Sequence, residues 1–154
     1  LKKSNTVPMA VGKFALEPGK SEAMDQSLGS RAATIVSSKD NSFAQMLKDA
    51  VKQELTAAGK FDQNSTTVIS GLLTKNSLET PIGTGKGTLG AKFSVAQGSK
   101  VVYEKELVES AEWSSAFLGA DAIPTAITEY TSLYKKLLAR LFGDDDFKQA
   151  TRAK

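Results

Sequence analysis

The chain of 154 residues contains no cysteine and no histidine. Without cysteine it forms neither disulfides nor thiolate metal sites, and without histidine it lacks imidazole ligands and the usual Ser-His-Asp or Cys-His nucleophile pairs. A metal ion would need carboxylates alone, and the tight cluster Asp144-Asp145-Asp146 lacks the alternating spacing of a calcium loop. We therefore expect no metal, no cofactor and no catalytic residue, and we interpret the three aspartates as a solvated turn after a helix.

Long apolar runs and a basic block are also missing. No stretch approaches the ~18 apolar residues that cross a bilayer. The 20 Lys and Arg residues and the 17 Asp and Glu residues are mixed along the chain and leave a formal charge of +3, so a nucleic-acid partner is not expected. A content of 40% apolar and 24% charged residues is ordinary for one globular domain.

The N-terminal half predicts one strand, one short β-prone segment and one helix. The strand covers 7–16, and the β-prone segment, 33–36, follows a polar connection. Apolar residues then recur at spacings of three and four, which is typical of an amphipathic helix; they are Phe43, Met46, Leu47, Ala50, Val51 and Leu55. Asn41 or Ser42 can cap the start of this helix, and Gly59 can end it.

The middle of the chain predicts a meander of three strands. The first covers 66–78, with Gly71 at a bulge or a close backbone approach. Alternation over 89–96, a tight turn at 97–100 and a long strand over 101–113 predict a hairpin. The apolar residues that share one face of its second strand, interrupted by Lys105 and Glu109, are Val101, Tyr103, Leu107, Ala111 and Trp113.

A second helix follows, with a broad apolar face from Ile123 to Leu141. Asp121 is a plausible cap, and Pro124 then falls in the first turn, where proline is tolerated. Tyr130 and Tyr134 lie one turn apart, and we interpret them as core residues with hydrated hydroxyls.

These elements predict an α+β fold: a mostly antiparallel sheet of about four strands with two amphipathic helices packed on one face. We expect a disordered tether over 1–6, a single domain over 7–147 and a frayed polar tail over 148–154.

Residues 81–89, PIGTGKGTL, resemble a phosphate-binding loop at first sight. Such a loop runs from a strand through a glycine turn into the N-terminus of a helix. Here an alternating strand follows, and the G-x-x-x-x-G-K-[ST] pattern fails at Thr80 and Gly87. We interpret the glycines of 83–88 as a mobile connection between strands, and a nucleotide-binding enzyme that uses them is the less favoured alternative.

Trp113, the one tryptophan, stands shortly before Phe117 and Leu118 on a predicted connection. These three residues are the candidates for binding a partner, because aromatic residues are frequent anchors at interfaces. The competing interpretation, that Trp113 closes one end of the core, is favoured by the usual burial of tryptophan.

The order of four segments resembles the small envelope lipoproteins of Gram-negative bacteria, which include the YajG-like proteins and auxiliary lipoproteins of lipid-transport systems. The segments are FAQMLKDAVKQELTAAGKF, TTVISGLL, AKFSVAQGSKVVYEKEL and ADAIPTAITEYTSLYKKLLARLF, and the resemblance covers about 7–147. Such proteins carry a lipobox signal, are acylated on an N-terminal cysteine and are tethered to the outer membrane, facing the periplasm. In this chain, which begins at Leu1, the acylated cysteine is absent.

The resemblance implies a non-catalytic periplasmic domain that acts as an adaptor or binding module in envelope assembly or transport. Its partner would be an envelope protein or lipid, and a lipid anchor upstream of Leu1 would hold it at the membrane. A carrier of lipids or small ligands, with a cavity between the helices and the sheet, is the alternative.

Overall fold

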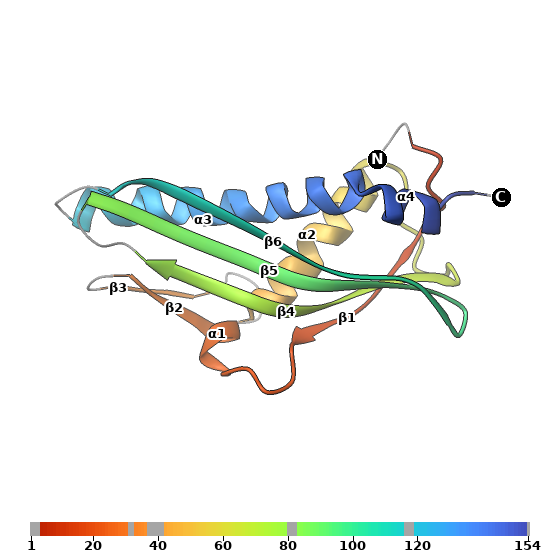
Figure 1. Ribbon diagram of the computed structural model, residues 1–154, viewed down its shortest axis with the longest axis horizontal. Helices are drawn as coiled ribbons and strands as arrows, with labels where there is room; N and C mark the ends of the chain where they lie inside the picture. The colour runs from red at the N-terminus through yellow and green to blue at the C-terminus, as the bar shows by residue number, and fades with distance from the viewer. Residues whose placement is uncertain (1–3, 31–32, 37–41, 80–82, 116–118, 154) are drawn as a thin grey trace.

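A four-stranded sheet forms the body of the molecule in the computed structural model, which describes residues 4–30, 33–36, 42–79, 83–115 and 119–153 (Figure 1). The strands lie in the order β1-β4-β5-β6. β1 runs parallel to β4, and the other neighbours are antiparallel. The strands are β1 (Ala10–Leu16), β4 (Thr67–Glu79), β5 (Gly83–Gln97) and β6 (Lys100–Ser115). The predicted fold class is confirmed.

Two helices, α2 (Phe43–Ala57) and α3 (Gly119–Gly143), share one core with a face of this sheet. The cap predicted for α2 is Ser42, whose hydroxyl accepts a hydrogen bond from the Gln45 amide at 3.2 Å. Gly59 follows with a φ of +71°, the left-handed conformation expected where the helix ends. The residues of α2 that face the core are Phe43, Ala44, Leu47, Val51 and Leu55.

The sequence patterns missed two short elements in the N-terminal half. The expected polar connection over 17–31 contains α1 (Ala23–Gln26) and β2 (Ser27–Ser30), and β2 pairs with β3 (Ala33–Val36), the β-prone segment. Asp25 of α1 accepts hydrogen bonds from the Ser42 hydroxyl and, at 2.8 Å, from the Ala44 amide. These contacts with the start of α2 hold a helix that is too short to be stable by itself.

Helix α3 starts earlier than the predicted cap. It begins at Gly119, so Asp121 lies inside the helix, and Pro124 lies beyond the first turn. The helix continues to Gly143, and a further short helix, α4 (Asp145–Ala150), follows. We expected 148–154 to be a frayed tail, but α4 extends to Ala150 and Thr151 is fully buried.

A register shift between β5 and β6 changes which residues of the hairpin face the core. Val95 pairs with Tyr103, but Ala96 pairs with Val101, so Val102 is an extra residue on β6. Val101 is consequently 57% exposed, whereas Val102 packs against the core. The prediction that Val101 shares the core face of Tyr103 is therefore wrong, because a bulge interrupts the alternation.

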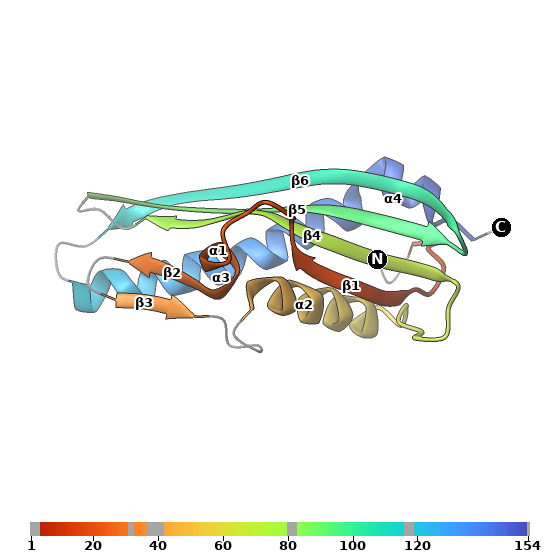
Figure 2. The ribbon, with the colours of Figure 1, turned by 90° about the horizontal axis from the view of Figure 1, so that it is seen from below.

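The molecule is elongated, and its described ends lie together (Figures 1 and 2). Thr6 forms an antiparallel bridge with Arg152, and the Ala153 amide donates to the Asn5 carbonyl at 2.8 Å. The turn between β5 and β6 lies at the same end, whereas the start of α3 lies at the opposite end. A tether at the N-terminus would leave the start of α3 farthest from the attachment point.

Candidate interaction surface

The glycine-rich segment is the first part of a strand. β5 begins at Gly83, and Gly87 pairs with Leu78 of β4 and with Ala111 of β6. Amides that pair within a sheet cannot converge on a phosphate as they do before a helix. The geometry excludes a phosphate loop over Gly83–Thr88, and the predicted mobile connection there is also wrong.

Trp113 is the physical reason for glycine at two positions of β5. It pairs with Gly85, where an added Cβ would overlap Nε1 and Cε2 of the indole. At Gly87 an added Cβ would lie 3.3 Å from Leu133 Cδ1 and 3.4 Å from Trp113 Cη2. The indole thus lies against the β5 backbone on the face that α3 covers. Only glycine leaves room for it at position 85.

Of the three candidate partner-binding residues, the structure describes Trp113. Trp113 packs against the core while remaining partly exposed. Its Nε1 is buried and has no hydrogen-bond partner among the described residues. Phe117 and Leu118 lie outside the described residues. The core contacts of Trp113 fit the interpretation that it closes one end of the core, and the role of all three in binding stays a prediction.

The two edges of the sheet differ in how they are covered. Along β1, Gln45 donates to the Phe14 carbonyl at 2.7 Å, and Gln63 donates to the Val11 carbonyl at 3.5 Å. Just before β1, Met9 forms a bridge with Phe61. Side chains and a crossing segment therefore satisfy two carbonyls of β1 and the backbone just before it, as proteins commonly do at sheet edges.

The outer edge of β6 pairs with no other strand in the part of the chain that the structure describes. Arg140 donates to the Val108 carbonyl at 2.6 Å, so this carbonyl points away from β5. The N–H and C=O groups of one residue in an antiparallel strand point to the same side, and the side alternates along the strand. We call the outward-pointing backbone groups the β6 edge; they belong to Glu104, Glu106, Val108, Ser110 and Glu112.

Carboxylates accumulate beside the β6 edge. Glu104, Glu106 and Glu112 are exposed, and Asp145 is exposed on α4. None of these four forms an ion pair with another described residue. Lys92 and Lys86 of β5 stand opposite Glu106 and Glu112 in the register, on the inner side of the strand. The row of side chains nearest the outer edge is therefore acidic in a chain whose formal charge is +3.

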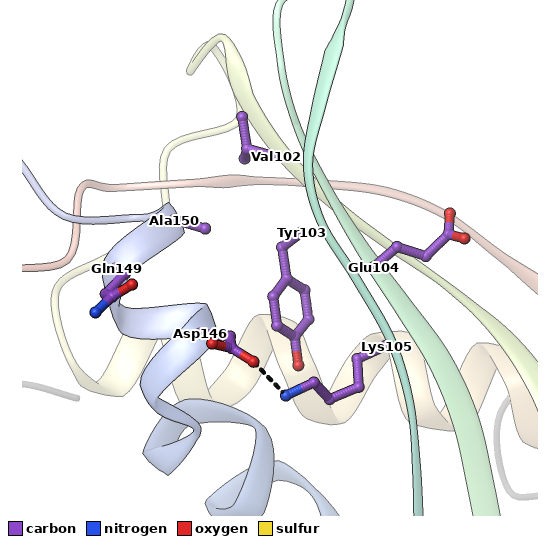
Figure 3. Close-up of a pocket in the computed structure, with 7 residues that line it drawn as sticks. All are labelled: Val102, Tyr103, Glu104, Lys105, Asp146, Gln149 and Ala150. Atoms are coloured by element: carbon purple, nitrogen blue, oxygen red, sulfur yellow. Dashed lines mark hydrogen bonds and ion pairs between the residues drawn. The ribbon is translucent and has the colours of Figure 1, made fainter.

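Two grooves run along the same strand where it faces the C-terminal helices. One, of about 480 Å³, lies between β6 and α4 and is lined by residues from Val102 to Lys105 and by Asp146, Gln149 and Ala150 (Figure 3). The other, of about 450 Å³, continues past Lys105 to Arg140 of α3. The Glu104 side chain points away from α4, so the strand separates an outer acidic row from the grooves.

A polar cluster between the grooves fastens the end of α3 and the start of α4 to β6. Lys105 Nζ lies 2.9 Å from Asp144 Oδ2 and 2.7 Å from Asp146 Oδ2, and the Tyr103 hydroxyl donates to Asp144 at 2.7 Å. The Asp144 side chain is 17% exposed, so the expected solvated turn is wrong at this residue. Asp145 and Asp146 lie in the first turn of α4, where the helix dipole favours anions.

The pKa values of the cluster follow its hydrogen bonds. Burial acts to raise the pKa of Asp144, but the hydrogen bonds from Lys105 and Tyr103 outweigh it and lower this pKa below its ordinary value. The hydrogen bonds to Asp146 and Asp144 raise the pKa of Lys105. Burial, with a contribution from Asp144, raises the pKa of Tyr103. The arrangement favours the charged carboxylate and the neutral phenol, as a structural clamp requires.

Asp144→Asn is expected to lower the melting temperature at pH 7 by about 2–4 °C. A partly exposed ion pair contributes up to about 1 kcal/mol, and a loss of this energy shifts the melting temperature by that amount in a domain of 154 residues. A lowered folded pKa contributes stability above the unfolded pKa that is lost as the pH falls through the folded value. The difference between the two proteins should therefore shrink as the pH falls below the ordinary Asp value of about 3.9 and through the lower folded value. Thermal melts at pH 7 and at successively lower pH measure it, with Asp145→Asn as the control; a difference that stays constant into acid would contradict the clamp.

Under α3, two tyrosines form a buried polar group. The Tyr130 hydroxyl donates to Asn76 Oδ1 at 2.5 Å and lies 2.8 Å from the Tyr134 hydroxyl, while Asn76 Nδ2 donates to the Met24 carbonyl at 2.7 Å. Tyr130 is 1% and Tyr134 4% exposed, so the predicted hydration of their hydroxyls is wrong. Asn76, which accepts the hydrogen bond from Tyr130, lies on β4, and it bonds in turn to Met24 of α1. The helical spacing of the two tyrosines does not reveal these contacts.

The layer between the helices and the sheet is filled by side chains. Phe43 of α2 contacts Tyr130 of α3 edge-on, and Phe14 contacts Phe93 within the sheet face. Four surface hollows formed by described residues lie outside this layer, along β6, near the chain ends and on the uncovered sheet face. A carrier would need its cavity where these rings pack.

Comparison with solved structures identifies proteins of similar fold. A crystal structure of a DUF330 family protein from Xanthomonas campestris has a TM-score of 0.57 and 14% identity, over 87% of this chain and 82% of that chain. The two chains share a fold. A hypothetical protein from Chlamydia trachomatis follows with a TM-score of 0.51 and 10% identity, over 90% and 96%. A minor lipoprotein from Acinetobacter baumannii has a TM-score of 0.46 and 14% identity, over 96% and 99%.

These comparisons confirm, at the level of the fold, the resemblance expected from the sequence. None of the three proteins is named as an enzyme. No family model matches the chain, and no curated protein matches it significantly. Within the described residues, every helix is too short or too polar to cross a membrane.

Proposed function

We propose that this chain is the periplasmic domain of an outer-membrane lipoprotein and acts as a non-catalytic adaptor in envelope assembly or transport. A lipid anchor upstream of Leu1 would hold the end where Thr6 meets Arg152. The other end, with Trp113 and with Phe117 and Leu118 beyond it in sequence, would reach toward an envelope protein or lipid.

One observation carries the adaptor role: among the described residues, no other strand pairs with the outer edge of the 16-residue strand β6. Such an edge offers backbone groups to another chain, whereas core side chains occupy the layer between the helices and the sheet. The sequence resemblance to envelope lipoproteins supports the envelope location, and the fold shared with the DUF330 protein agrees with that resemblance.

Location and tether are tested together in a Gram-negative host that expresses the full-length gene with a C-terminal tag. We expect the protein to label with a fatty-acid analogue and to sediment with the outer-membrane fraction. Replacing the acylated cysteine by serine should abolish the label and release the protein. An unlabelled protein in the cytosolic fraction would refute the proposed location.

Native mass spectrometry of gently purified protein distinguishes the adaptor from the carrier alternative. We expect the mass of the polypeptide alone, because core side chains occupy the layer between the helices and the sheet. A lipid retained at one molecule per chain would favour the carrier and contradict the adaptor.

A further inference from the structure

We propose that the β6 edge binds an extended peptide segment of a partner protein, as an added strand, and that this segment carries lysine or arginine at alternate positions. The inference deepens the adaptor function proposed above by naming the surface and the partner chemistry. An added strand gains affinity from main-chain hydrogen bonds and specificity from the side chains at alternate positions.

The backbone of β6 is prepared for such a strand. From Glu104 to Glu112, every second residue directs its N–H and C=O groups outward, and Arg140 is the described side chain that occupies one of them, the Val108 carbonyl. Gln45 and Gln63 occupy the corresponding groups of β1 at the opposite edge. The two edges are therefore not equivalent, and β6 is the one that can accept a neighbour.

The carboxylates beside the β6 edge favour a basic segment as the added strand. On the outer face, residues of an added strand would stand opposite Glu104, Glu106 and Glu112, and opposite charges on directly facing residues stabilise a sheet. On the helical face, alternate residues would enter grooves that Lys105 and Arg140 line together with acidic residues, and Lys105 already pairs with Asp146. Basic side chains are therefore favoured in the outer row, at every second position of the added strand, and not in the row that enters the grooves.

A second copy of β6 is a poor occupant of the same edge. Antiparallel pairing centred on Val108 would set Glu104 of one copy opposite Glu112 of the other, and pairing centred on Glu106 would set this residue opposite itself. Like charges that face each other directly are destabilising. The acidic row therefore discourages self-association as well as attracting a basic strand.

The test titrates the folded domain with a blocked octapeptide in which lysine alternates with valine and threonine, using isothermal calorimetry and amide chemical shifts. We expect shifts along Glu104 to Glu112. A peptide of the same composition with contiguous lysines, and one with glutamate in place of lysine, should each bind at least about tenfold more weakly.

Two variants separate backbone pairing from charge. Val108→Pro removes an N–H that points away from β5, so the sheet is retained while the added strand is blocked, and we expect a loss of about tenfold or more in affinity. The double variant E104K/E106K should lose a similar factor, whereas Glu54→Lys on the exposed face of α2 should stay within about twofold. Circular dichroism confirms that each variant is folded.

Several results would overturn the proposal: no binding, shifts confined to residues away from β6, or equal affinity for alternating and contiguous lysines. Unchanged binding by Val108→Pro would also overturn it, because attraction by charge alone needs no free backbone group. Dimers of the isolated domain in light scattering that Val108→Pro dissociates would assign the edge to a second copy instead. The titration does not depend on cellular location, so its failure is distinguishable from failure of the membrane tether.

Discussion

Gly85→Ala is expected to lower the free energy of unfolding by about 1–3 kcal/mol, the usual effect of overpacking a filled site. The new methyl group would overlap the indole of Trp113, a ring fixed by its pairing in β6 and its contact with the core. Elsewhere in a strand the same change is favourable by roughly 0.5–1 kcal/mol, because alanine restricts the unfolded chain. Contact with the indole is therefore the reason that Gly85→Ala should destabilise the domain and not stabilise it.

A double-mutant cycle assigns the effect to the ring. Trp113→Ala should destabilise the domain by itself, and in that background Gly85→Ala should become neutral or slightly stabilising. Gly143→Ala is the control, because an added Cβ there meets nothing within 4 Å. Denaturant unfolding of the four proteins and the control provides the free energies. Equal effects of Gly85→Ala with and without Trp113 would show that the glycine serves another purpose.

Above pH 10 the domain should lose stability steeply: Tyr130 and Tyr134 contribute about 2.7 kcal/mol per pH unit, at 1.36 kcal/mol each, and Tyr103, whose pKa is also raised, adds to this loss. Burial raises the pKa of Tyr130, although its hydrogen bonds to Tyr134 and Asn76 act in the opposite direction. Burial, together with the neighbouring Tyr130, raises the pKa of Tyr134. A raised folded pKa contributes stability that is complete below the unfolded value near 10 and is lost as the pH rises beyond it.

Denaturant midpoints between pH 8 and pH 11.5 measure this loss, and phenolate absorbance reports ionisation. We expect absorbance from Tyr130 and Tyr134 only together with the loss of far-ultraviolet circular dichroism. Tyr134→Phe should reduce the slope by about 1.4 kcal/mol per pH unit, because one titrating group is removed. If both phenols ionise near pH 10 in folded protein, the buried Tyr130–Asn76 contact is not as described.

Elements with a regular apolar period could be predicted from the sequence. The stripe from Phe43 to Leu55 defined α2 to within a residue or two because burial on one face imposes the helical period. The β5–β6 hairpin could be predicted for the same reason at period two. By contrast, α1 is four residues long, and it is held by contacts of Asp25 with the start of α2, which no local pattern encodes.

The candidate surface was harder to predict because it depends on register. Counting back from the turn, where Gln97 pairs with Lys100, would place Gly85 opposite Glu112. The bulge at Val102 shifts the pairing by one residue and brings Trp113 onto Gly85. The acidic β6 edge was visible only as scattered glutamates, since the sequence does not show which strand lies at the edge of the sheet.

Amide hydrogen exchange of β6, resolved by residue, tests the central claim most directly. In the free domain, the amides of Glu104, Glu106 and Ser110 should exchange faster than those of Lys105 and Leu107, which face β5. With the alternating lysine peptide at saturation, the first group should slow by about tenfold or more while the amides of β1 stay unchanged. Slow exchange of the first group in the free domain, or protection that appears only near Trp113, would contradict the account.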